Sequence, residues 1–160
     1  MLALEKIFDI TIQNRKILYK ILTRTPHKLL FEIPEGYRNN IWWNIAHVVV
    51  TQQILVYKFS NLTPRIDDSL IQKFKKGTLP DIPPTDEEID HIGGFLLSTA
   101  EWAQEDYENG VFKAYNEYTT STRVILRNVE DALAFNLYHE GLHLGVILSL
   151  DKILLKEEAF

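Results

Sequence analysis

The chain has 160 residues, of which 46% are hydrophobic, and its formal net charge is -5. This length and composition fit one globular domain over residues 1–160. The lysines and arginines, Arg15, Lys16 and Lys20 among them, are scattered and form no dense basic stripe, so neither nucleic acid nor a membrane is expected as a partner. The chain contains no cysteine, which excludes a disulfide framework, a thiolate metal site and a cysteine nucleophile.

The N-terminal residues do not resemble a secretory signal. Glu5 and Lys6 lie where a signal peptide needs its apolar core. No apolar run approaches the roughly 20 residues that span a bilayer. These features predict a cytoplasmic protein.

Helical periodicity dominates the first half of the chain. Apolar residues recur at three- and four-residue steps over residues 2–23, and Pro26 ends this first predicted helix. A second helix is predicted over about 40–61, with an inner stripe of Trp43, His47, Val50, Ile54 and Tyr57. Residues 62–84 hold four prolines and one glycine, so they are predicted to be a long connection with at most a short helix.

The second half predicts two further helices. Thr85 and Glu88 form a capping-box pattern before a helix over about 86–108, and residues 111–127 are predicted to be irregular. Asn128 is predicted to cap a last helix, whose inner face reads Ala132, Phe135, His139, His143, Val146, Leu150 and Ile153. Four amphipathic helices without a convincing strand predict an all-α four-helix bundle.

Three of the five histidines lie in apolar helical stripes. His139 and His143 are four residues apart, which places them on one helix face with Cβ atoms about 5–6 Å apart. Two buried imidazoles without a partner would cost several kcal/mol, whereas a divalent metal ion would satisfy both. His47 is the natural third ligand because it also lies on an inner stripe. His27 and His91 have no partner at ligand spacing and are interpreted as surface residues.

A shared metal site constrains how the helices run. His47 lies roughly 10 Å into the second predicted helix and His143 roughly 21 Å into the last one, at 1.5 Å per residue. These depths coincide only when two helices roughly 30 Å long are antiparallel. We therefore expect the second and fourth helices to run in opposite directions.

Residues 139–143 also match the HExxH pattern of zinc proteases, in which Glu140 would be the general base. The metzincin extension fails, since Val146 and Ser149 stand at its Gly and His positions. A protease is therefore the least favoured alternative, and Glu140→Gln is expected to have only a mild effect on activity. Asn44 and Asn136, each three residues before a ligand, are the candidates for supporting the ligands or lining the pocket.

Two segments resemble the DinB superfamily, also called DinB/YfiT-like metalloenzymes: Asn-Asn-Ile-Trp-Trp-Asn-Ile-Ala-His at 39–47 and Ala-Leu-Ala-Phe-Asn-Leu-Tyr-His-Glu-Gly-Leu-His-Leu-Gly at 132–145. The resemblance spans nearly the whole chain. It implies an up-down-down-up bundle in which residues 62–84 cross over between the second and third helices. It also implies a nickel or zinc ion on His47, His139 and His143.

The resemblance narrows the function without fixing the reaction. Some relatives transfer low-molecular-weight thiols such as bacillithiol or mycothiol. Some are dimers, so the resemblance suggests a homodimer for this chain. Three neutral imidazoles leave a metal with an open position, as in catalytic sites. The first hypothesis is thus a metal-dependent transferase or hydrolase of small molecules. The alternative is a non-catalytic metal-binding or dimerising bundle with a stress-related role.

Overall fold

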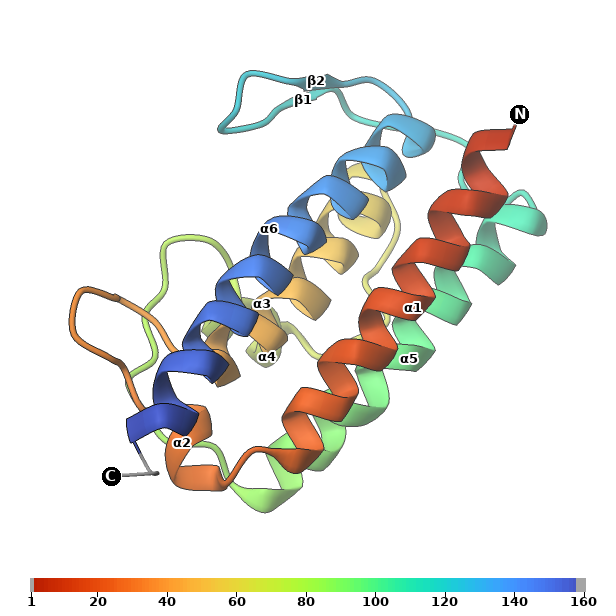
Figure 1. Ribbon diagram of the computed structural model, residues 1–160. Helices are drawn as coiled ribbons and strands as arrows, with labels where there is room; N and C mark the ends of the chain where they lie inside the picture. Colours follow the sequence, from red (N-terminus) through yellow and green to blue (C-terminus); the bar gives the residue numbers. More distant parts are fainter. Residues whose placement is uncertain (1, 158–160) are drawn as a thin grey trace.

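The structure is a computed structural model that describes residues 2–157, and it is predominantly helical (Figure 1). Its helices are α1 (Leu2–Arg24), α2 (His27–Phe31), α3 (Ile41–Gln52), α4 (Asp68–Phe74), α5 (Asp86–Glu108) and α6 (Val129–Glu157). A π-helical turn η1 (Gln53–Tyr57) and a 3-10 turn η2 (Lys58–Ser60) prolong α3. The predicted all-α class is confirmed, and the four predicted helices correspond to α1, α3 with its two turns, α5 and α6.

The four longer helical segments lie side by side. α1 packs against both α5 and α6, and α3 packs against α6. In Figure 1, α3 and α5 run in the direction opposite to that of α1 and α6. α3 and α6 are thus antiparallel, as they must be if His47 and His143 are to lie at the same level of the bundle. In the part of the chain that the structure describes, no helix is both long and apolar enough to cross a membrane.

Local capping explains where three of the helices begin. The Asn40 side chain accepts a hydrogen bond from the Trp43 backbone N–H at 2.8 Å, which starts α3. Thr85 and Glu88 form both bonds of the predicted capping box at the start of α5. At the start of α6, the Asn128 side chain accepts from the Asp131 N–H at 2.7 Å, as the sequence predicted.

A small β-hairpin corrects the prediction that residues 111–127 are irregular. β1 (Tyr118–Thr119) and β2 (Ile125–Leu126) pair antiparallel, with Tyr118 opposite Leu126. The turn is closed by the Thr120 N–H, which donates to the Val124 carbonyl at 2.9 Å, while Arg123 adopts a left-handed conformation (φ 68°). Two-residue strands are too short to show alternating hydrophobicity, so the sequence carried no clear signal for them.

The π-helical turn lies directly after the part of α3 that carries His47. A π turn misaligns the helical backbone ladder, and such turns are frequent at functional sites. Here the Leu55 carbonyl accepts a hydrogen bond from the Tyr115 hydroxyl at 3.1 Å, and the Gln53 side chain accepts from the Arg65 N–H at 2.7 Å. The turn is thereby hydrogen-bonded to the connection over residues 62–84, through Arg65, and to the connection over residues 111–127, through Tyr115.

Candidate metal centre

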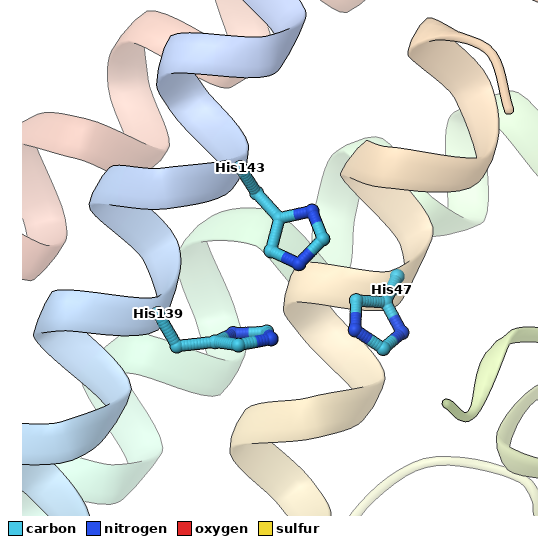
Figure 2. A group of neighbouring side chains, drawn as sticks. All are labelled: His47, His139 and His143. Carbon is cyan, nitrogen blue, oxygen red and sulfur yellow. The ribbon is translucent and has the colours of Figure 1, made fainter. Parts of the chain in front are cut away.

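Three histidines that are far apart in the sequence converge between α3 and α6 (Figure 2). His47 comes from α3, and His139 and His143 come from successive turns of α6. One ligand nitrogen from each lies within 4.8 Å of the other two, which is close enough for a shared metal ion. His27 and His91 lie outside this cluster and are exposed, as predicted from the sequence.

Neighbouring groups hold the His47 ring in one orientation. Its Nδ1–H donates to the Phe74 carbonyl at 2.7 Å, so the lone pair is on Nε2, where it accepts from the Thr51 hydroxyl at 3.2 Å. Trp43 stacks on the imidazole with ring centroids 4.5 Å apart and planes inclined by 12°. A histidine ligand oriented through its other ring nitrogen in this way is typical of metal sites.

His143 is supported by a side chain from the facing helix. Its Nδ1 lies 2.7 Å from Asn44 Oδ1. The Asn44 amide donates to the Asn40 carbonyl at 2.7 Å and to Asn39 Oδ1 at 2.9 Å, which fixes the amide so that Oδ1 faces the imidazole. His143 Nδ1 therefore carries the proton and Nε2 keeps its lone pair. As the sequence predicted, Asn44 contacts a candidate ligand, and this ligand is His143 on the facing helix.

His139 is the least supported of the three. Its Nδ1 is buried and has no hydrogen-bond partner within the described part of the chain. Its ring is turned toward the other two imidazoles (Figure 2), with centroids 5.2 Å from His47 and 4.5 Å from His143. A buried imidazole in this position is costly when it is left without partners, so the arrangement fits a bound cation.

Burial keeps all three imidazoles neutral. Burial, with smaller contributions from charge repulsion by His143, His47 and Arg15, lowers the pKa of His139 to about 3. Burial, with a smaller contribution from His47, lowers the pKa of His143 to about 4. The pKa of His47 is also lowered by burial, although its bond to Phe74 opposes the shift. Neutral imidazole is the form that binds a metal, so the site is ready for one at neutral pH.

Glu140 does not have the role that the HExxH pattern suggests. Both Glu140 and Arg15 are completely buried, and they form a two-pronged ion pair: Arg15 Nε donates to Oε2 at 2.9 Å and Nη2 donates to Oε1 at 2.8 Å. The Asn136 amide also donates to Oε1, at 2.7 Å. Both carboxylate oxygens are thus occupied, which argues against Glu140 as a general base.

The ion pair links the helices that carry the histidines. Arg15 on α1 also lies within 3.4 Å of acceptors on α3 and α5, namely the Val48 carbonyl, Gln52, the Leu96 carbonyl and Thr99. Together with Glu140 on α6, this one guanidinium touches all four long helices. It therefore helps to set the distance between α3 and α6, and with it the spacing of His47 from His139 and His143.

The predicted inner face of α6 is shifted by about one residue. The fully buried positions include Asn136, Glu140, Ile147, Leu150 and Leu154, whereas Phe135, His139, His143, Val146 and Ile153 are half-buried at the edge of that face. From the sequence alone, Arg15 was interpreted as one of the scattered cations. A usable signal existed: Arg15 stands four residues after Thr11 and three before Leu18, in the apolar stripe of α1.

A partly open cleft of about 140 Å³ adjoins the cluster. His47 and His139 form part of its wall, and His143 does not. The other lining residues come from α3 and its π turn, η2, the loop after α4, the hairpin and α6: Thr51, Ile54, Leu55, Phe59, Lys76, Tyr118, Thr120, Ser121 and Phe135. A small molecule in this cleft would therefore lie beside two of the three imidazoles.

Asn44→Ala is expected to weaken metal binding by about 10- to 100-fold, because it removes the acceptor that orients His143. The measurement is competition with a chelating dye on protein purified without a metal-affinity tag. Asn39→Ala is the matched control, since it removes only the outer neighbour of the Asn44 amide and should change the affinity far less. Equal affinity in wild type and Asn44→Ala would show that this hydrogen bond does not support a ligand.

Comparison with known proteins identifies a family for this chain. The sequence profile of the DinB superfamily matches residues 10–147, which include all three histidines as well as Arg15, Asn44 and Glu140. No match was found among curated proteins. Because the matched region covers most of the 160 residues, the chain belongs to the DinB superfamily.

Proposed function

We propose that this protein is a metal-dependent enzyme that acts on small molecules, with His47, His139 and His143 as the ligands of one divalent ion, nickel or zinc. The observation that carries the proposal is the convergence of three neutral imidazoles, within 4.8 Å of one another, at the wall of a cleft. We further propose that the chain is one domain, a four-helix bundle of up-down-down-up order, with residues 62–84 as the crossover. The opposed directions of the helices in Figure 1 support that topology.

The site suits chemistry with an exogenous nucleophile. When bound by three histidines, a divalent ion keeps an open position and can lower the pKa of a water or thiol there. The chain itself has no cysteine to act as a nucleophile. Thr51, Thr120 and Ser121 bring hydroxyl groups to the cleft, which can hold a substrate by hydrogen bonds. We propose a transferase that uses a low-molecular-weight thiol, or a hydrolase that uses water.

The HExxH protease is disfavoured by the ion pair of Glu140 with Arg15. The stronger alternative is a non-catalytic metal-binding bundle, either monomeric or a homodimer, with a stress-related role. Under this alternative the protein would bind the metal with the same affinity, but it would show no turnover. Assays of thiol transfer to small electrophiles and of ester hydrolysis, each with metal-loaded protein, separate these two proposals.

The metal site is tested by metal content. Protein purified without a metal-affinity tag should contain about one divalent ion per chain, and His47→Ala should lose it as completely as His143→Ala, since two remaining imidazoles hold a metal weakly. His91→Ala is the matched control, because His91 is an exposed histidine outside the cluster. Full metal content in His47→Ala, measured by elemental analysis, would remove His47 from the ligand set.

A further inference from the structure

The cleft beside the histidines has a one-sided charge pattern. Among the described residues that line the cleft, Lys76 is the only lysine or arginine, and there is no aspartate or glutamate. The cleft therefore carries a positive charge, whereas the protein as a whole has a net charge of -5. In the part of the chain that the structure describes, Lys76 also forms no ion pair. An ammonium group at such a wall attracts anions and is not neutralised by the protein.

The backbone near Lys76 is fixed relative to the metal centre. Lys76 follows α4 by two residues, and the last residue of α4 is Phe74, whose carbonyl accepts the hydrogen bond from His47. The preceding lysine differs, since Lys75 Nζ donates to the Gln72 side chain and does not line the cleft. Only the second of these two adjacent lysines is therefore available to a molecule beside His47.

The rest of the cleft is suited to an apolar group. Ile54, Leu55, Phe59 and Phe135 line it, and Phe59 stacks on Tyr118 with ring centroids 4.4 Å apart. Its volume of about 140 Å³ is close to that of an engineered cavity of about 150 Å³ that holds benzene. A six-carbon ring or a short alkyl chain therefore matches the space between these side chains.

We propose that this cleft binds a small molecule with an apolar body of about six carbons and one anionic group, and that Lys76 selects the anion. The apolar body lies against Ile54, Leu55 and Phe135, and the anionic group lies at the open side, next to the Lys76 ammonium. This inference rests on the proposed function, because it takes the molecule bound in the cleft to be the substrate of the proposed metal-dependent enzyme. It can be tested without the metal.

The test uses two probes of the same shape, phenylacetate and phenylacetamide, titrated into chelator-treated protein and followed by NMR. Removing the metal prevents the carboxylate from binding to it directly. Wild type is expected to bind phenylacetate about fivefold more tightly than phenylacetamide, as a partly solvated ion pair allows. Lys76→Met should abolish this preference, so that the two probes bind with equal affinity. Lys75→Met is the matched control and should keep the preference.

Three results would overturn the proposal: equal binding of both probes by wild type, a preference that survives Lys76→Met, or no binding of either probe at millimolar concentration. The metal content of the same preparations, measured before chelation, reports on the proposed function separately. Protein that lacks metal but prefers phenylacetate through Lys76 would refute the metalloenzyme and retain the anion site. Protein that contains metal but shows no preference for phenylacetate would refute the anion site and leave the proposed metalloenzyme standing.

Discussion

Glu140→Gln is expected to lower the free energy of unfolding by about 3–5 kcal/mol. The change leaves the completely buried guanidinium of Arg15 without its counter-charge, and an uncompensated buried charge is strongly destabilising. From the sequence alone we expected only a mild effect of this change on activity. Because Glu140 is completely buried, we expect its main effect to be on stability. Urea denaturation of the metal-free protein measures the effect without interference from metal binding.

Two controls test the physical reason. Asp9→Asn breaks a Lys6–Asp9 ion pair of the same 2.8 Å length, but this pair is exposed, so stability should not change measurably. The double variant Arg15→Met with Glu140→Leu removes both charges and should recover most of the loss, since a buried ion pair can be replaced by apolar side chains at little cost. If the double variant were as unstable as the single one, the cost would come from lost packing and not from charge.

The same experiment separates the bundle from a zinc protease. In a protease the glutamate of HExxH activates water, so its amide variant keeps the fold and loses turnover. Here the main loss is in stability, because Oε1 and Oε2 both serve Arg15. A Glu140→Gln protein with unchanged stability that lost peptidase activity would favour the protease.

The sequence predicted the histidine cluster because periodicity and spacing carry that information. An i, i+4 pair and a third histidine on another amphipathic helix were enough to propose a common site, and ligand depth gave the relative direction of α3 and α6. Cap residues such as Thr85 and Asn128 likewise predicted where α5 and α6 begin. These features are local, so they can be read from one sequence.

The sequence did not predict the Arg15–Glu140 pair because its partners are 125 residues apart and both are charged. Charged side chains are normally assigned to the surface, and a completely buried pair is recognised only once the helices are packed. The cleft escaped prediction for a related reason. Its walls come from four segments that are separate in the sequence, and the π turn and hairpin that shape it have weak sequence signals.

Acid is expected to destabilise the metal-free protein strongly between pH 7 and pH 4.5. Unfolded histidines take up protons below about pH 6.5. In the folded protein, burial lowers the pKa of His139 to about 3 and that of His143 to about 4, so both imidazoles stay neutral over most of this range. The unfolded state therefore binds more protons, and stability falls as the pH falls. Each imidazole should contribute about 2–3 kcal/mol to the loss, at 1.36 kcal/mol per pKa unit.

Histidine variants separate the contribution of the histidines to this loss of stability from that of the carboxylates, which also titrate in acid. His139→Gln removes one buried imidazole, so its stability should fall by about 2–3 kcal/mol less than that of wild type between pH 7 and pH 4.5. His91→Gln alters an exposed histidine and should follow the wild-type curve. The free energy of unfolding, measured by urea titration of chelator-treated protein at both pH values, gives the comparison. If wild type and His139→Gln lost the same stability in acid, the imidazole of His139 would not be held neutral by burial, and the main electrostatic feature of the candidate metal centre would be wrong.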